Sequence, residues 1–251
     1  METNEYIFGL HSVFEAIEAG RDIDKILVKK DLHSDMAVRL HDLARRYQIP
    51  MQRVPVEKLN RITRKNHQGV IALLSAVTYQ KLEHVVPQLY EDGIQPFMLV
   101  LDGVTDVRNF GGMARTAECC GVNAIVIPEP GSVTVNGDAV KTSAGALNYL
   151  PVCRERNLYD AVRFLKDNGY QVVAATEKAD YNYTRGNYTG PAAIVMGAED
   201  CGISPDVLKL CDTKVSIPMF GHIGSLNVGV AAAVMMYEVV RQRLEADLEV
   251  L

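Results

Sequence analysis

The sequence contains no tryptophan, few aromatic residues and no Cys-x-x-Cys pair. Its five cysteines form no disulfide framework, because their number is odd and adjacent cysteines pair poorly. They therefore predict free, mostly buried thiols in a reducing compartment. The six histidines are scattered without the spacing of metal ligands, so we expect no metal site. The cysteines are Cys119, Cys120, Cys153, Cys201 and Cys211.

Long hydrophobic segments and targeting signals are also missing. No apolar run approaches the roughly 20 residues that span a bilayer. The N-terminal METNEYIFGL has no basic region followed by an apolar run. The richest apolar stretch, Leu226 to Val240, is short and rich in alanine, which predicts a buried helix. We therefore expect a cytoplasmic protein with no membrane partner.

What is present is an ordinary globular composition over 251 residues, 48% of them hydrophobic and 23% charged. The net charge of −5 argues against a nucleic-acid partner, but the charge is unevenly spread. Lys58, Arg61, Arg64 and Lys65 bring four positive charges to one short segment without a negative one. Two interpretations stay open: a phosphate-binding cluster, which depends on such local charge, or a solvated helix face.

Residues 1–77 carry the pattern of a small α/β domain. Apolar residues at helical spacing predict helices over 10–17 and 36–47, with Gly20 ending the first and Ser34 capping the second. Residues 78–95 contain Pro87 and Gly93 and show no strong period. They are interpreted as a linker, within which a short helix is possible. Strands are predicted at 25–29, 51–54 and 70–77.

Residues 96–251 predict a second α/β domain with a mostly parallel sheet. Apolar strands alternate with helical periods, which is typical of a parallel sheet covered on both faces. Ligands of such sheets bind at the carboxyl ends of strands, which directs attention to the loops that follow them. The predicted strands are 97–101, 124–127, 171–175, 192–196 and 214–217.

Three loops hold the candidate site residues. The first, residues 102–117, contains Asn109, a glycine pair, and Arg115 at the start of the next predicted helix, where a guanidinium can bind phosphate. The second, residues 195–205, places Glu199 at a strand end, as a structural ion-pair partner or as a site residue. It ends at Ser204 and Pro205, an expected helix cap and first helical residue. The third, residues 217–227, brings Ser225 and Asn227 to a helix start, where capping is the default explanation.

The order and spacing of these loops resemble one family. The segments NFGGMAR (109–115), VMGAEDCGIS (195–204) and IPMFGHIGSLNV (217–228) resemble the three motifs of the SpoU branch of SPOUT RNA methyltransferases. GLHSV (9–13) and NHQGV (66–70) resemble the ribosomal-protein-like RNA-binding domain that precedes this fold. The combination is most similar to bacterial 23S rRNA (guanosine-2′-O-)-methyltransferases. One departure is Val107, where the family commonly has proline.

The resemblance implies a C-terminal sheet tied into a trefoil knot, and S-adenosylmethionine as the methyl donor. It also implies that Arg115 is the proposed base. Because a guanidinium with a pKa above about 12 hardly releases its proton, holding a phosphate and stabilising the 2′-oxygen suit Arg115 better. Asn109, Glu199, Ser225 and Asn227 are the other catalytic candidates, with Glu199 fixing Arg115 or a backbone amide. By the same likeness, the cofactor-binding residues are Met196, Gly197, Ile217, Pro218 and Leu226. The basic run predicts that Arg61, Arg64 and Lys65 bind RNA, together with Arg115.

Family members are typically homodimers, so we expect a homodimer. Apolar residues of the last helix either form its interface or pack within the chain. For function, the leading hypothesis is 2′-O-methylation of a guanosine in large-subunit rRNA. A tRNA substrate and a catalytically silent RNA-binding assembly factor are the alternatives, and the presence of all five catalytic candidates argues against the silent factor. The helix residues are Val228, Ala231, Ala232, Met235, Met236 and Val239.

Overall fold

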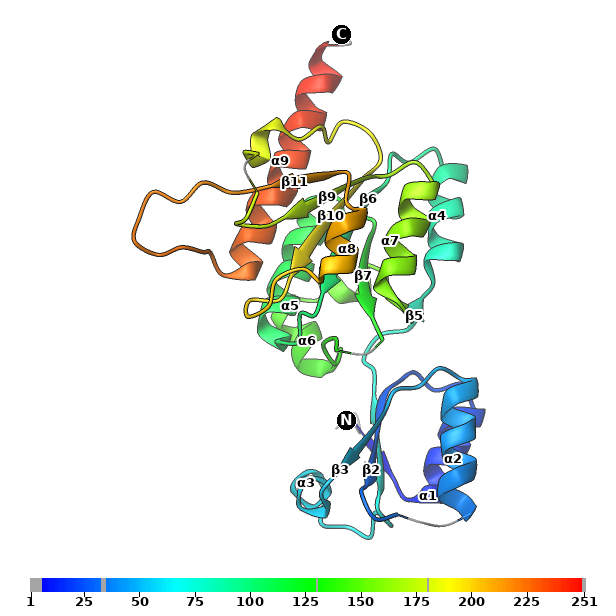
Figure 1. Cartoon of the computed structure of the whole chain (residues 1–251). Coiled ribbons are helices and arrows are strands. Elements are labelled where there is room, and N and C mark those ends of the chain that lie inside the picture. The colour runs from blue at the N-terminus through cyan, green and yellow to red at the C-terminus, as the bar shows by residue number, and fades with distance from the viewer. Residues whose placement is uncertain (1–5, 33–34, 130, 180, 250–251) are drawn as a thin grey trace. The chain divides into compact units, whose positions relative to one another are not determined.

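A computed structural model (Figure 1) describes residues 6–32, 35–129, 131–179 and 181–249. The chain divides into two compact units. The smaller comprises residues 1–78 with 134–137, and the larger comprises 79–133 with 138–251. Each unit has its own sheet and its own hydrophobic core.

The smaller unit, blue to cyan in Figure 1, is a four-stranded sheet in the order β1-β4-β2-β3, with helices on both faces. Only the β2–β3 pair is parallel. Alternate residues of β2 serve the two faces: Ile26 and Val28 pack with α1 and α2, whereas Leu27 packs with Leu59 of α3. The elements are β1 (Tyr6–Phe8), α1 (Leu10–Glu18), β2 (Ile23–Lys29), α2 (Asp35–Arg46), β3 (Met51–Val54), α3 (Val56–Ile62) and β4 (Val70–Leu74).

Most of this unit was predictable from the sequence. The two predicted helices are confirmed as α1 and α2, and Gly20 takes the left-handed backbone expected just after a helix end (φ 68°). Ser34 lies outside the described residues. β1 and α3 were not predicted, because three residues and seven residues carry too little periodicity.

The larger unit is built on a parallel sheet in the order β11-β9-β10-β6-β7-β8-β5. Its central strands are apolar and fully buried, as expected when helices cover both faces. α4, α7 and α8 lie on one face, and α5 packs against α9 on the other (Figure 1). The strands are β5 (Tyr79–Gln80), β6 (Phe97–Asp102), β7 (Ala124–Pro128), β8 (Val152–Glu155), β9 (Gln171–Ala175), β10 (Ala192–Gly197) and β11 (Thr213–Val215). The helices are α4 (Leu82–Glu91), α5 (Val107–Cys119), α6 (Gly137–Thr142), η1 (Ala146–Asn148), α7 (Leu158–Asp167), η2 (Tyr183–Arg185), α8 (Pro205–Leu210) and α9 (Val228–Glu249).

The interpretation of residues 78–95 as a linker is wrong. β5 pairs with β8, and α4 buries Leu82, Val85 and Val86 in the core of the larger unit. The spacing of these residues is helical, but Pro87 inside α4 conceals it, because proline normally ends a helix. The short helix that the sequence made possible within this range is α4, and it forms part of the helical layer on one face of the larger sheet.

The first loop is also shorter than predicted. α5 begins at Val107, and the Asp106 carboxylate caps it by accepting the Asn109 N–H at 2.8 Å. The glycine pair and Arg115 therefore lie inside the helix. Gly111 is required for packing, because a Cβ there would lie 2.6 Å from the Thr142 Cβ of α6. Valine in place of the family's proline still starts the helix, since the cap comes from Asp106.

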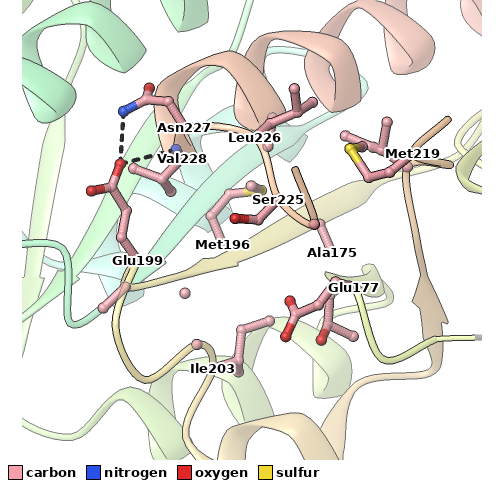
Figure 2. A pocket seen from close by; sticks show the side chains of 17 residues that line it. Ala175, Glu177, Met196, Glu199, Ile203, Met219, Ser225, Leu226, Asn227 and Val228 are labelled. Carbon is pink, nitrogen blue, oxygen red and sulfur yellow. Dashed lines mark hydrogen bonds between the residues drawn. The ribbon is translucent and has the colours of Figure 1, made fainter. Parts of the chain in front are cut away.

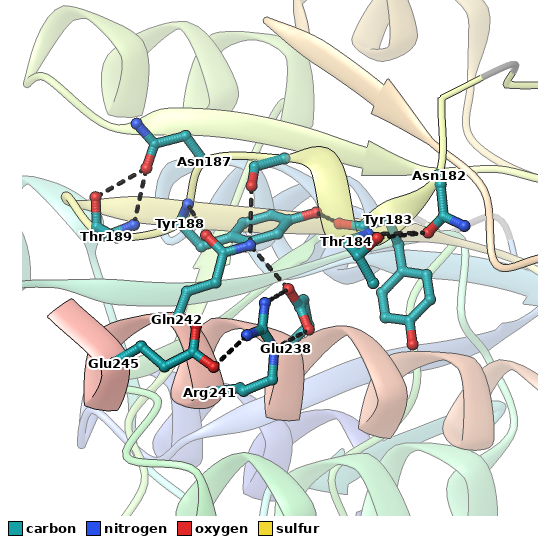
Figure 3. A network of polar contacts seen from close by, with 11 residues as sticks. Asn182, Tyr183, Thr184, Asn187, Tyr188, Thr189, Glu238, Arg241, Gln242 and Glu245 are labelled. Atoms are coloured by element: carbon teal, nitrogen blue, oxygen red, sulfur yellow. Dashed lines mark hydrogen bonds and ion pairs between the residues drawn. The ribbon is translucent and has the colours of Figure 1, made fainter.

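A polar network fastens the segment after β9 to α9 (Figure 3). The Glu238 side chain is 5% exposed and accepts hydrogen bonds from Arg241 at 2.7 Å and Gln242 at 2.8 Å. Gln242 also donates to the Gly186 carbonyl and accepts the Tyr188 N–H. The hydrogen bond from Arg241 lowers the pKa of Glu238, so this buried carboxyl stays ionised. α9 thus holds in place the segment that follows the carboxyl end of β9.

Among the described helices, none is both long enough and apolar enough to cross a membrane. The helix predicted at the apolar stretch is confirmed as α9, which is longer than that stretch. It is buried along one face only, because Val230 and Tyr237 are exposed.

Candidate functional site

Two of the predicted loops leave neighbouring strands at the same edge of the larger sheet. β6 and β10 pair in parallel and end in register, with Gly197 opposite Asp102. The Asp102 carboxylate then accepts the Ser204 N–H at 2.7 Å, which ties the second loop to the end of β6. Ser204 precedes α8, and Pro205 is its first residue as predicted, but the Ser204 side chain makes no capping bond.

Three predicted site residues, Glu199, Asn227 and Asn109, meet in one hydrogen-bonded cluster. Figure 2 shows the Glu199–Asn227 part of it. Glu199 Oε1 accepts the side-chain amides of Asn227 at 2.7 Å and Asn109 at 3.2 Å. The Asn227 amide also donates to the Asn109 side-chain oxygen at 3.0 Å. One residue from each predicted loop is thereby joined, which sequence spacing alone could not show.

The cluster is built on the N-terminus of α9. Glu199 Oε1 also accepts the Val228 N–H at 3.3 Å, and Asn227 Oδ1 accepts the N–H groups of Gly229 at 2.9 Å and Val230 at 3.4 Å. These N–H groups have no partner within the helix, and the helix dipole favours a negative charge beside them. Asn227 is therefore the predicted cap, and Glu199 takes the backbone-amide role expected of it.

Beside this cluster opens a pocket of about 380 Å³ (Figure 2), a size typical of small-molecule sites. Its walls come from the ends of β9 and β10, the loops that follow them, and the approach to α9. Most of the side chains are apolar, and two carboxylates face the cavity. The lining residues are Ala175, Thr176, Glu177, Met196, Gly197, Ala198, Glu199, Gly202, Ile203, Ile217, Met219, Gly224, Ser225, Leu226, Asn227, Val228 and Ala231.

Most of the residues predicted to hold a cofactor line this pocket. Met196, Gly197, Ile217 and Leu226 do so, whereas Pro218 lies between two lining residues without being one. Packing also requires glycine at position 197, because a Cβ there would collide with the backbone of Gly202 and Ile203. Of the predicted catalytic residues, Glu199, Ser225 and Asn227 line the pocket, and Asn109 reaches it through its hydrogen bonds.

Arg115 stands apart from the cluster. It lies exposed in the middle of α5 and is not part of the pocket wall. Within the described chain it makes no ion pair or hydrogen bond, so the expectation that Glu199 fixes Arg115 is not met. The Arg115 guanidinium is therefore available to a ligand from outside the chain.

Sequence reasoning missed Glu177. Together with Ala175 and Thr176 it enters the pocket from the end of β9. The predicted strand at 171–175 ends at the same edge of the sheet as β10, so the strand-end rule that selected Glu199 would also have selected Glu177.

Cysteine and metal chemistry find no support at this edge. A hydrogen bond with Asp200 raises the pKa of the exposed Cys201 thiol, so Cys201 is a poor thiolate nucleophile. Among the described residues, no three histidine, cysteine or acidic side chains lie close enough together to hold a metal ion.

The basic segment of the smaller unit forms a second candidate site. Lys58 and Arg61 lie on α3, Arg64 and Lys65 follow it, and all four side chains are exposed. Lys65 Nζ lies 5.9 Å from the centre of the Phe8 ring, a cation–π distance. The segment thus combines charge that has no ion-pair partner among the described residues with a neighbouring aromatic ring, as single-stranded RNA-binding surfaces do.

The loop behind this segment is fixed by His67. Gly69 N–H donates to His67 Nδ1 at 3.0 Å, so the proton of a neutral ring is on Nε2, which donates to Asn60 Oδ1 at 3.0 Å. This explains the NHQG motif structurally: the histidine is buried and holds the loop to α3.

Comparison with known families assigns both units. The SpoU rRNA methylase family matches residues 96–237, and the substrate-binding domain of RNA 2′-O-ribose methyltransferases matches residues 6–80. The chain belongs to the SpoU methyltransferase family. It is therefore an RNA 2′-O-ribose methyltransferase.

Two bacterial relatives, both assigned to the TrmH family of tRNA/rRNA methyltransferases, match almost the whole chain. The one from Staphylococcus saprophyticus is 37% identical over 237 residues, covering 94% of this chain and 95% of the relative. The one from Bacillus subtilis is 34% identical over 244 residues, covering 96% and 97%.

Solved structures share the fold. The SpoU methyltransferase AviRb from Streptomyces viridochromogenes, determined with S-adenosylmethionine, superposes with a TM-score of 0.59 at 24% identity, covering 96% of this chain and 90% of AviRb. The TrmH/SpoU tRNA-modifying enzyme of A. aeolicus superposes with a TM-score of 0.56 at 29% identity, covering 66% and 86%. The predicted α/β fold with a parallel sheet is thus confirmed.

Proposed function

We propose that this SpoU enzyme methylates the ribose 2′-oxygen of a guanosine in large-subunit (23S) rRNA, with S-adenosylmethionine as methyl donor. The main support is that one chain contains both units: a substrate-binding unit with an exposed basic segment, and a methyltransferase unit with a pocket large enough for a small molecule. The guanosine and the large subunit rest on the likeness of the motifs at 9–13 and 66–70. The relatives' designations cover tRNA as well as rRNA, so tRNA is the second candidate.

The pocket suits S-adenosylmethionine chemically. Met196, Ile203 and Leu226 offer apolar surface to an adenine, and Gly197 and Ile217 line the same pocket. The Glu177 and Glu199 carboxylates match the positive charge of a sulfonium ion and an ammonium group. Pro218 fixes the backbone between Ile217 and Met219, which both line the pocket. These residues hold the cofactor, at the place where the family threads its chain into a trefoil knot.

When bound, S-adenosylmethionine supplies an activated methyl group, so the protein has to align the ribose and help the 2′-proton leave. The Glu199–Asn109–Asn227 cluster fixes all three loops in one arrangement. Ser225, on the pocket wall, orients the ribose. Arg115 binds the adjoining phosphate and stabilises charge on the 2′-oxygen, a role that suits the planar fork of a guanidinium.

The enzyme acts in the cytoplasm, where bacterial RNA resides, and works as a homodimer. The residues first considered for the interface are packed within the chain: Met235, Met236 and Val239 are fully buried. The opposite face of α9 instead exposes Val230, Tyr237, Leu244 and Leu248 at helical spacing. An apolar stripe of this kind on a soluble domain marks a contact surface.

The test is methyl transfer from labelled S-adenosylmethionine to unmodified large-subunit rRNA or to unmodified tRNA, followed by nucleoside analysis. We expect label in 2′-O-methylguanosine from rRNA alone. Label in tRNA would retain the chemistry and replace the substrate. Because an assembling particle is also a possible substrate, it is tested as a third acceptor, and no label in any of the three would contradict the proposed activity.

A further inference from the structure

We propose that Glu177 gives the pocket a preference, based on charge, for the methyl donor over the demethylated product. The proposal rests on S-adenosylmethionine being the cofactor, as argued above. It does not depend on which RNA is the substrate.

Glu177 reaches the pocket from the end of β9. β9 pairs with β10 so that Ala175 lies opposite Met196, and both residues line the cavity. Glu177 follows two positions later, with its carboxylate across the cavity from Glu199, and Met196 and Ser225 lie between them (Figure 2). The two acids therefore face a bound molecule from opposite sides of the cavity.

The two carboxylates differ in how they are compensated. Glu199 Oε1 already accepts three N–H groups, from Asn109, Asn227 and Val228. The Glu177 carboxylate has no hydrogen bond or ion pair to any described residue, and the described wall of the pocket contains no cation. Glu177 is thus the pocket carboxylate that has no stabilising hydrogen-bond donor among the described residues before a ligand binds.

Donor and product differ by one methyl group, and therefore in the charge on the sulfur atom. S-adenosylmethionine carries a positive sulfonium, whereas the product has a neutral thioether, and both share the adenine, ribose and amino acid. Contacts to those shared parts cannot tell the two molecules apart, whereas an uncompensated negative charge can. For a carboxylate about 5 Å from the sulfonium in a water-exposed pocket, Coulomb's law gives a ratio of roughly fivefold to tenfold in affinity.

The functional consequence concerns turnover. When the methyl group leaves, the attraction between Glu177 and the sulfur ends, and the product is released more readily. The Glu177 side chain is exposed and buries no surface in the core. Replacing it should therefore change ligand affinity and not the stability of the fold.

Calorimetric titration without RNA tests the proposal. Wild type, Glu177→Gln and the control Asp200→Asn, which removes an exposed carboxylate outside the pocket wall, are titrated with three ligands. The ligands are S-adenosylmethionine, S-adenosylhomocysteine and sinefungin, in which a protonated amine replaces the methylsulfonium. For Glu177→Gln we expect roughly fivefold to tenfold weaker binding of the two positively charged ligands and less than about twofold change for S-adenosylhomocysteine. Asp200→Asn should change none of the three.

Equal weakening of all three ligands by Glu177→Gln would overturn the proposal, because it would place Glu177 on a shared group. Unchanged binding of all three would overturn it as well. Failure of the wild type to bind any of them would instead refute the cofactor assignment itself, so the two failures are distinguishable.

Discussion

At the residue scale, the candidate site contains two kinds of side chain: those that hydrogen-bond to one another, and those that have no partner among the described residues. Glu199, Asn109 and Asn227 satisfy one another across three loops. Arg115 and Glu177, in contrast, have no partner among the described residues. A charged side chain without a partner in the described chain is available to a charged group of a ligand.

Arg115→Lys should lose most of the methyl-transfer activity. A lysine keeps the charge but loses the planar fork that binds a phosphate through two hydrogen bonds, and removal of one such stabilising group typically costs about 10²-fold in rate. Affinity for S-adenosylmethionine should stay unchanged, because Arg115 does not line the pocket. Arg163→Lys, on the exposed side of α7, is the matched control. Near-normal turnover of Arg115→Lys would remove Arg115 from the mechanism.

The predictability of these residues depended on their surroundings. Glu199 and Asn227 were found because a strand end and a helix start are visible in the sequence. Their mutual contact was not, since residues 28 positions apart meet only through the sheet. Arg115 was placed at a helix start because Gly111 and Gly112 were interpreted as a turn, whereas Gly111 packs against α6.

At the element scale, the cap of α9 is shared by folding and function. Asn227→Ala should lower the free energy of unfolding by about 1 kcal/mol, the usual cost of a lost cap, and should also lower methyl transfer, because the cluster opens. Asn157→Ala removes the cap of α7, where the Asn157 side chain accepts the Tyr159 N–H at 2.9 Å. Denaturant unfolding should show a similar loss for both variants, with activity lost in Asn227→Ala alone. Equal activity in the two would reduce Asn227 to a structural cap.

The basic segment is predicted to bind phosphate. Replacing Arg61, Arg64 and Lys65 together by glutamine should weaken RNA binding and flatten its salt dependence. The log–log slope should fall by up to about 0.7 for each phosphate of single-stranded RNA that the variant no longer neutralises. The control removes the same charge from α2 of the same unit. Its three residues are Arg39, Arg45 and Arg46, all exposed.

Binding measured at several salt concentrations distinguishes the two triple variants. Unchanged binding in the first, or equal weakening in both, would make the segment after α3 an ordinary solvated surface.

Elements were predictable where a period extended over enough residues. The helical periods at 10–17 and 36–47 predict α1 and α2, whereas the central strands and α9 are visible as apolar runs. β5 and β8 are two and four residues long, and their pairing depends on neighbours distant in sequence. β11 (Thr213–Val215) is also short, but it corresponds to the strand predicted over 214–217. α4 was interpreted as linker because Pro87 interrupts a pattern that tertiary packing nevertheless keeps helical.

At the scale of the whole molecule, the exposed stripe of α9 predicts a dimer. Tyr237→Asp combined with Leu244→Asp should convert a dimer into a monomer, because two buried carboxylates at an apolar interface are unpaired. Tyr149→Asp, at a side chain 82% exposed elsewhere in the same unit, is the control. Light scattering should show half the molar mass for the double variant alone. A monomeric wild type, or a double variant that remains dimeric, would contradict this assignment.

The central claim is that this chain methylates one guanosine ribose in 23S rRNA. The most direct measurement compares large-subunit rRNA from cells with and without the gene, mapped by resistance to alkaline hydrolysis, since a 2′-O-methyl group blocks cleavage at its own position. We expect one guanosine to lose protection in the deletion strain, and we expect wild-type protein, but not Arg115→Lys, to restore it. An unchanged rRNA pattern, with protection lost in a tRNA instead, would contradict the claim.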